Sequence, residues 1–408
     1  MFREQIMVAA GDYHAACVTS DGNVYTWGME MKIIGRRVST PTIMYGKPHL
    51  PAVMVSCGAS FTMILEVGGT VYTCGCGLHA NSGELGREFS TALRSIDSAF
   101  FGGAPVGMIA AGDTHSMAVG RDSGTGTLWT WGNNRQGQLG HGTYGIVCVP
   151  TRVEDKVLQD AGGVVTIAAG CDFSMAVTKD GVAWACGSGE CGELGLGTFN
   201  NHNTFQRVGC PECFGGSGVR MVSCGFAHTL FVAKDNSVWG CGTCKMLGIH
   251  AETDASDDLV LWPIRLERIN DDTQHFDTND VIVVAAGVFH SIAVSTAGLL
   301  YTWGEKPDMW SANGLGYVSA EMVCPPQVVP MPPGVTGGIR FGRWHEVVPC
   351  DNKLTFAMTA HERVGSDSAW HGMPPELMRK IFDVERTFFS PAAGTSQGVV
   401  NMLGSGSI

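Results

Sequence analysis

Short apolar runs recur along the chain, and turn-forming residues separate the members of each pair. The runs AACVTSDG at 15–22 and SMAVTKDG at 174–181 both end in Asp-Gly. A second run then ends in an aromatic residue or cysteine followed by glycine, as at Trp27–Gly28 and Cys74–Gly75. Two such runs joined by Asp-Gly or a substitute predict a β-hairpin. The pattern therefore predicts paired strands along most of the chain.

A short motif with a central glycine precedes each hairpin. Its copies are AAGDYH at 9–14, SCGASF at 56–61, AAGDTH at 110–115, AAGCDF at 168–173, SCGFAH at 223–228, AAGVFH at 285–290 and a weaker RFGRWH at 340–345. Gly-x-Leu-Gly segments close several copies, and extended runs such as CVPTRVE at 148–154 follow. Four strands in a repeat of about 50 residues correspond to one propeller blade.

The copies at 110–142 and 168–197 carry the fullest motif: Ala-x-Gly-x-x-His or Phe, then Asp-Gly or a longer turn, then Trp-Gly or Cys-Gly, then Gly-x-Leu-Gly. This motif resembles the regulator-of-chromosome-condensation (RCC1-type) repeat over residues 6 to about 360. The resemblance implies an all-β fold, a seven-bladed β-propeller over residues 1–360. Family propellers close by pairing segments from both chain ends. The seventh copy lacks Trp-Gly after its hairpin, so we expect residues near the N-terminus to complete the last blade.

Composition narrows the class of partner. Glycine contributes 56 of 408 residues, which suits many tight turns. The formal charge is −12 and no basic run is present at either end, so direct nucleic-acid binding is not expected. The chain has 15 cysteines without a framework spacing, no apolar signal segment and no apolar stretch long enough for a membrane span. We expect an intracellular protein, cytoplasmic or nuclear, without membrane contact.

The last position of the motif holds His14, His115, His228, His290 and His345, with Phe61 and Phe173 in the other two copies. Zinc ligands must lie a few ångströms apart, whereas equivalent positions on packed sheets lie about 10 Å apart. Phenylalanine in two copies also shows that the position accepts an apolar ring. We interpret the histidines as structural residues bonded to neighbouring backbone groups.

Two CxxC pairs and one glycine pattern suggest metal or nucleotide binding at first sight. Cys241 of the pair Cys241–Cys244 occupies the position that holds tryptophan in other copies, so we interpret these cysteines and Cys210–Cys213 as unlinked, buried thiols. The segment 187–192 matches Gly-x-Gly-x-x-Gly, but GELGLG follows it. That continuation predicts a turn, whereas the dinucleotide motif needs a helix.

No nucleophile elbow, HExxH motif or phosphate loop is present in the sequence. We therefore predict no catalytic residue, metal or cofactor, and a non-catalytic protein–protein interaction scaffold that presents propeller loops to partners. The acidic segment 251–280, the longest insertion between blades, is either a solvated loop or a docking patch for a basic partner. Its candidate contact residues are Asp254, Asp257, Asp258, Asp271 and Asp272.

Residues 361–408 form a tail outside the repeats. An amphipathic helix is predicted at about 373–389, before a Gly/Ser-rich end; it packs on the propeller or on a partner. Its candidate contact residues are Met373, Leu377, Ile381 and Phe382. The string Met-Pro-Pro-Glu-Leu…Ile-Phe is similar to the opening helix of an F-box, which implies a substrate-recognition subunit of a ubiquitin ligase. A complete F-box runs over several helices, whereas only residues 383–408 follow Phe382.

Two further functions come from the RCC1-type resemblance. One is guanine-nucleotide exchange on a Ran-like small GTPase, which in the family accompanies a basic N-terminal extension that the first residues here do not contain. The other is ultraviolet photoreception, which relies on several Gly-Trp-Arg-His-Thr motifs. This chain carries one related string, GRWHE at 342–346, with the order changed. An interaction scaffold remains the leading hypothesis.

Overall fold

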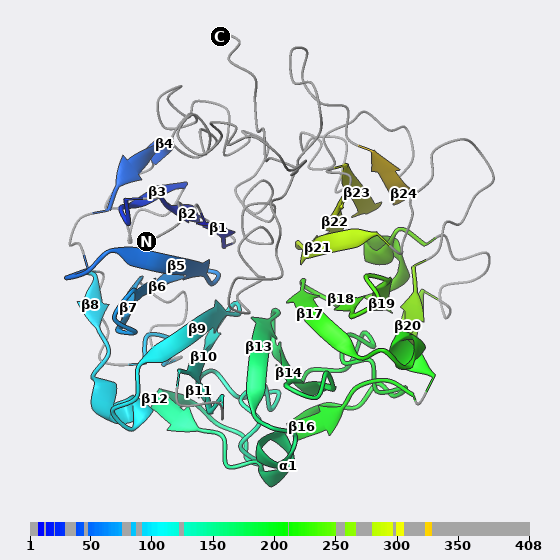
Figure 1. The fold of residues 1–408 in the computed structure, drawn as a ribbon, viewed down its shortest axis with the longest axis horizontal. Helices are drawn as coiled ribbons and strands as arrows, with labels where there is room; N and C mark the ends of the chain where they lie inside the picture. The colour runs from blue at the N-terminus through cyan, green and yellow to red at the C-terminus, as the bar shows by residue number, and fades with distance from the viewer. Residues whose placement is uncertain are drawn as a thin grey trace, which may run out of the picture.

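The computed structural model describes residues 7–11, 14–19, 21–28, 38–44, 48–75, 83–86, 92–121, 126–210, 212–249, 258–266, 280–296, 299–305 and 323–328. Within these ranges the chain forms six four-stranded sheets, each with its strands paired in sequence order. Each sheet is a blade. The blades follow one another around a ring, with the first strand of each nearest the centre and the fourth outside (Figure 1). The chain is thus an all-β propeller, as the repeat pattern predicts.

All 24 strands of these blades follow the repeat. Blades 1 to 3 contain β1 (Met7–Ala10), β2 (His14–Val18), β3 (Val24–Gly28) and β4 (Val38–Ile43); β5 (Ala52–Cys57), β6 (Phe61–Glu66), β7 (Val71–Gly75) and β8 (Arg94–Ser95); and β9 (Val106–Ala111), β10 (His115–Gly120), β11 (Leu128–Gly132) and β12 (Val147–Arg152). Blades 4 to 6 contain β13 (Val164–Ala169), β14 (Phe173–Thr178), β15 (Ala183–Gly187) and β16 (His202–Arg207); β17 (Val219–Cys224), β18 (His228–Ala233), β19 (Val238–Thr243) and β20 (Leu259–Arg265); and β21 (Val281–Ala286), β22 (His290–Ser295), β23 (Leu300–Glu305) and β24 (Val323–Val328).

Short helices that the sequence analysis did not predict occur outside the strands. Three lie between blades: η1 (Ser98–Phe101), α1 (Lys156–Asp160) and η2 (Cys213–Gly216); η3 (Cys244–Leu247) lies between β19 and β20. The Asp97 and Asp155 side chains cap η1 and α1 by accepting the backbone N–H groups of Ala99 and Val157. None of the helices in the described ranges is long and apolar enough to cross a membrane.

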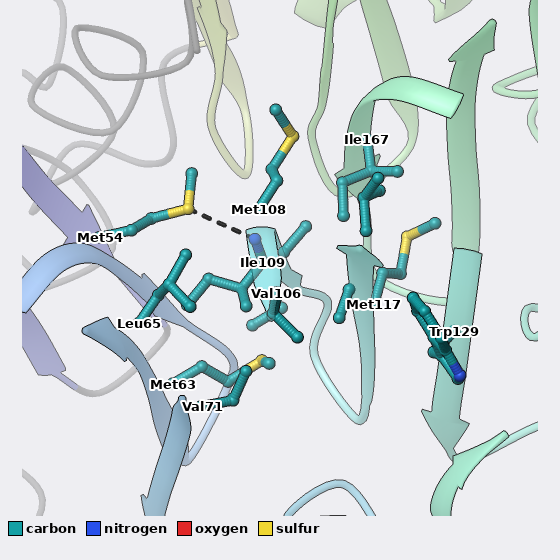
Figure 2. Close-up of a cluster of buried hydrophobic side chains, with 14 of the residues drawn as sticks. Met54, Met63, Leu65, Val71, Val106, Met108, Ile109, Met117, Trp129 and Ile167 are labelled. Carbon is teal, nitrogen blue, oxygen red and sulfur yellow. Dashed lines mark hydrogen bonds between the residues drawn. The ribbon is translucent and has the colours of Figure 1, made fainter. Parts of the chain in front are cut away.

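The second strand of each blade is the most buried. Every residue of β2, β6, β10, β14, β18 and β22 is buried. In blades 2 to 5, the described neighbours pack against both sides of the blade. Alternation of apolar and polar residues is therefore weaker than in a sheet with one solvated face. Figure 2 shows one seam, where Met63 of β6 and Met54 of β5 lie opposite Ile109 of β9, and the Ile109 N–H lies 3.3 Å from the Met54 sulfur.

A glycine at or next to the end of each third strand pairs with the first residue of the second strand, as Gly132 pairs with His115. Gly132 has a φ of 109°, and an added Cβ would lie 2.7 Å from the His115 Cα. Only glycine combines this backbone conformation with such a close approach. The Trp-Gly dipeptide of the repeat therefore ends a strand at a point where the chain must turn sharply.

One sequence prediction is wrong, and two others concern residues outside the described ranges. The seventh repeat copy at 340–345, and the tail with its predicted helix at about 373–389, lie outside the described residues, so the seventh blade and that helix stay predictions. The segment 251–280 is not one insertion between blades, because β20 (Leu259–Arg265) lies inside it and forms the fourth strand of blade 5. The run LVLWPIR at 259–265 is apolar enough for a strand, although acidic residues flank it on both sides.

Candidate functional site

The two sides of the ring carry different connections. In an antiparallel blade, the loop between the first and second strands and the loop between the third and fourth lie at the same end. We call this side the loop face. The hairpin turns between the second and third strands, and the connections between blades, lie on the other side, the turn face. The Gly-x-x-His motifs lie on the loop face, around the centre of the ring.

The motif glycines bring neighbouring blades into backbone contact. The Asp113 N–H lies 3.4 Å from the Gly170 carbonyl oxygen of the next blade, and the Phe226 N–H lies 3.3 Å from the Gly287 carbonyl oxygen. A Cβ added to Gly112 would lie 2.5 Å from the Gly170 oxygen and 2.3 Å from His115 Cε1. The motif therefore requires glycine here because the next blade and the motif's own imidazole fill the space.

The motif histidines reach hydroxyl groups of the next blade. His115 Nε2 lies 2.8 Å from Ser174 Oγ, and Ser174 Oγ donates to the Gln138 carbonyl oxygen at 2.7 Å. Because the serine proton points at that carbonyl, the imidazole must carry its proton on Nε2 and donate it. The sequence analysis expected backbone partners. The observed partner of Nε2 is a side chain, supplied by the neighbouring blade.

The contact between a motif imidazole and a hydroxyl of the next blade recurs at other seams. His14 Nε2 lies 2.7 Å from Thr62 Oγ1, and His228 Nε2 lies 3.0 Å from Ser291 Oγ. Where the motif ends in Phe61 or Phe173, the next blade's hydroxyl still donates to the second residue of Gly-x-Leu-Gly. The hydroxyl–carbonyl bond is therefore common to the four seams from blade 2 to blade 6, whereas the ring next to it is either imidazole or phenyl.

In blades 3, 4 and 5, the tryptophan or cysteine near the end of the third strand, which is Trp131, Cys186 or Cys241, bonds to the same carbonyl. Trp131 Nε1 donates to the Glu84 oxygen at 2.9 Å, and Cys241 Sγ lies 3.3 Å from the Glu193 oxygen. This confirms that Cys241 occupies the tryptophan position of the repeat. Burial raises the pKa of the Cys241 thiol well above its ordinary range, so it is a protonated donor.

Burial also controls the charge of the motif histidines. It lowers the pKa of His14 and His115 to about 4. Protonation would place a charge in a buried seam, and the Nδ1 atom of His115 has no hydrogen-bond partner among the described residues. At neutral pH these imidazoles are uncharged parts of the frame.

The other sequence motifs have local structural roles. Cys213, Cys241 and Cys244 are buried and Cys210 is half-buried, and all four are free thiols. The residues after Gly192 form turns, as predicted, so the glycine pattern at 187–192 does not open a helix. In the described part of the chain, no group of three or more His, Cys, Asp and Glu side chains is arranged to hold a metal ion.

Two exposed aromatic rings lie together on the loop face. Phe226 of blade 5 is 46% exposed and Phe289 of blade 6 is 38% exposed. Their ring centroids are 6.5 Å apart, with an interplanar angle of 39°. Phe226 is the first variable residue of its Gly-x-x-His motif and Phe289 is the second of its own. At these positions the first copy carries Asp12 and Tyr13, and the others that the structure describes carry Ala, Ser, Asp, Thr, Cys or Val. Sequence reasoning missed this pair, although aromatic residues at these positions were a usable signal.

Carboxylates occupy the corresponding loops of blades 3 and 4. Asp113 and Asp172 are both half-exposed, and the Gln138 side-chain amide fixes Asp172 by donating to its Oδ1 at 2.8 Å. The described Gly-x-x-His loops contain no lysine or arginine. The inner ring of the loop face thus combines an aromatic pair with an acidic side.

Of the partner-binding residues predicted from sequence, the structure describes one. Asp258 immediately precedes β20, and its carboxylate lies 3.8 Å from Lys245 Nζ in a partly exposed ion pair. Asp254, Asp257, Asp271 and Asp272 lie outside the described residues, as do Met373, Leu377, Ile381 and Phe382 of the tail. Their role in partner binding stays a prediction.

Comparison with known proteins gives the family. The model of the RCC1-like domain matches residues 2–348. The ultraviolet-B receptor UVR8 of Arabidopsis thaliana is 29% identical over 309 residues, covering 74% of this chain and 65% of UVR8. The E3 ubiquitin-protein ligase HERC2 of Homo sapiens is 27% identical over 323 residues, covering 76% of this chain and 6% of HERC2. This chain therefore spans less than two thirds of either relative.

Solved structures agree on the fold. Prp20p from Saccharomyces cerevisiae superposes with a TM-score of 0.63 at 20% identity, covering 79% of this chain and 76% of Prp20p. The family match covers most of the chain and includes every described blade. The chain belongs to the RCC1-like domain family of β-propellers.

Proposed function

We propose that this chain is a non-catalytic interaction platform that binds a protein partner through its loop face. The observation that carries the proposal is the contact between the exposed rings of Phe226 and Phe289. Single exposed apolar residues are common on protein surfaces, and the turn face has several, such as Leu50 and Phe100. Two aromatic rings in contact across adjacent blades form a larger apolar surface, of the kind that anchors binding partners.

The residues next to Phe226 and Phe289 are fixed by contacts between blades 5 and 6. Phe226 and Phe289 each lie within two residues of a buried motif histidine, His228 and His290. His228 is bonded to Ser291 of blade 6, and Phe226 is bonded through its N–H to Gly287 of the same blade. The backbone that carries the two rings is therefore anchored before a partner binds, which reduces the entropy lost on binding.

The relatives support a protein partner in general terms. Prp20p is described together with its binding properties to Gsp1p and histones, and HERC2 is named as a ubiquitin-protein ligase. Nucleotide exchange on a small GTPase and recruitment to a ubiquitin ligase are two more specific functions that both require binding of a protein partner. The described residues carry no observation that favours either of them.

Site-directed photo-crosslinking in cells tests the proposal. A photoreactive phenylalanine analogue replaces Phe226 or Phe289, and the matched control carries it at Phe100, a 42% exposed residue on the turn face. We expect the same protein to be captured from positions 226 and 289 and to be absent from position 100. Equal capture from all three positions, or no capture from the first two, would reject the loop face as the binding surface. Release of fluorescent nucleotide from Ran, measured with the same preparation, tests exchange activity separately.

A further inference from the structure

We infer that the loop face recognises a basic segment of its partner that carries an apolar anchor residue. The inference rests on the function proposed above and adds the chemistry of the bound segment. It follows from the placement of two kinds of side chain, Phe226 and Phe289 in blades 5 and 6 and Asp113 and Asp172 in blades 3 and 4. All four belong to equivalent loops around the centre of the ring.

The apolar half is the aromatic pair. Both rings are more than one third exposed, and their centroids lie 6.5 Å apart. A partner side chain such as Leu, Met or Phe can cover both rings at once and remove their faces from water. A lysine or arginine beside that anchor can also lie over an aromatic face, where the ring quadrupole attracts the cation.

The acidic half lies in the next loops around the ring. Asp113 is fixed by backbone bonds on both sides: its N–H faces Gly170, and its carbonyl oxygen accepts the Ala59 N–H at 3.1 Å. Asp172 is oriented by Gln138 and immediately precedes Phe173 at the start of β14. Glu190, an exposed carboxylate, lies on the same face in the loop between β15 and β16.

The charge of the Gly-x-x-His loops is one-sided, because their described part has two carboxylates and no lysine or arginine. The loops between third and fourth strands carry both signs, with the exposed Glu190 and the exposed Arg135. His14 and His115 add no charge at neutral pH, because burial lowers their pKa to about 4. The whole chain carries a formal charge of −12. A basic segment is therefore attracted at long range and paired at short range, whereas a nucleic acid or an acidic peptide is repelled.

Fluorescence anisotropy with the full chain tests the inference. The probe is the fluorescein-labelled peptide Lys-Arg-Lys-Phe-Leu-Lys-Arg-Lys, and a second probe replaces every basic residue with serine. The carboxylate variant combines Asp113→Asn and Asp172→Asn, which keeps the oxygen that accepts from Gln138. The matched control combines Glu154→Gln and Asp160→Asn, which removes the same charge from exposed positions on the turn face. Circular dichroism confirms that both variants are folded.

We expect the basic probe to bind and the carboxylate variant to weaken its binding by about tenfold, because two partly exposed ion pairs are lost. The control variant should stay within about twofold, and the serine probe should bind at least about tenfold more weakly. No binding of the basic probe, or equal weakening by both variants, would overturn the inference. If the serine probe binds as tightly as the basic one and Phe226→Ser with Phe289→Ser abolishes both, the basic segment is wrong while the loop face remains the binding surface.

Discussion

His115 of blade 3 and Ser174 of blade 4 are 59 residues apart in sequence, yet His115 Nε2 lies 2.8 Å from Ser174 Oγ in a buried seam. Ser174 Oγ in turn donates a hydrogen bond to the carbonyl oxygen of Gln138, which belongs to blade 3. The contact explains why the repeat combines a histidine with a hydroxyl residue directly after the equivalent position of the next copy. Repeats of this kind are stabilised largely by their interfaces with neighbouring repeats.

Substitutions at this seam should distinguish the contribution of the Ser174 hydroxyl to stability from that of the His115 ring. Ser174→Ala removes the donor to Gln138 and leaves the His115 N–H without its acceptor, so we expect a loss of about 2 kcal/mol in the free energy of unfolding. His115→Phe should cost less than about 1 kcal/mol, because Phe61 and Phe173 fill the same position in blades 2 and 4. Urea denaturation measures both values. A His115→Phe variant as unstable as Ser174→Ala would show that the imidazole itself is required.

Stability should also depend on pH. The folded chain keeps His14 and His115 neutral down to a pKa of about 4, whereas the unfolded value is 6.5. Between these values the unfolded chain binds more protons, so stability is complete above pH 6.5 and falls as the pH falls. Each histidine contributes a slope of at most about 1.4 kcal/mol per pH unit in this window.

The variant His115→Phe provides the control for this pH dependence. Urea midpoints are measured from about pH 7.5 to about pH 5, where the slope of the variant should be smaller by one histidine. An unchanged slope would mean that His115 is already protonated, or exposed, in the folded chain.

The motif glycine should tolerate no side chain. Gly112→Ala would place a Cβ 2.5 Å from the Gly170 oxygen of the next blade, so the two blades must separate. We expect a loss of about 3 kcal/mol. Gly107→Ala in β9 is the matched control, because the atom nearest to its added Cβ lies at 3.5 Å. Thermal unfolding of both variants is the measurement, and similar midpoints would contradict the close approach of the blades.

The hydrogen bonds of Ser116 and Trp131 should be energetically coupled. Both donate to the Glu84 carbonyl at 2.9 Å, so either one can satisfy it when the other is removed. We expect Ser116→Ala combined with Trp131→Phe to cost about 1 kcal/mol more than the sum of the single variants, because the carbonyl then loses both donors. A double-mutant cycle by urea denaturation gives this coupling. Additive losses would show that the two bonds are independent.

Much of the fold could be predicted because the strands and turns of each blade are formed by residues that are close together in the sequence. The Asp-Gly turn at 21–22, the strand end at Trp131–Gly132 and the extended run at 148–154 each correspond to one feature of a blade. The tryptophan position occupied by Cys241 was also predictable, because the repeat supplies the alignment. The third strand and its final glycine need no information from distant residues.

Contacts between blades could not be predicted in this way. The hydroxyl partner of His115 and the contact between Phe226 and Phe289 join residues in different repeat copies. The sequence shows which residues occupy equivalent positions but not how closely adjacent copies approach. The strand β20 was also not predicted, because the acidic residues on both sides of it make the segment 251–280 resemble a single loop.

Hydrogen–deuterium exchange on the full chain, with and without the protein captured at position 226, shows which face of the propeller binds the partner. We expect slower exchange on binding in the loop-face segments 112–115, 170–173, 225–228 and 287–290. The turns at 67–70, 179–182 and 235–237 on the turn face should exchange at unchanged rates. Protection confined to those turns, with no change in the loop-face segments, would show that the partner does not bind the loop face.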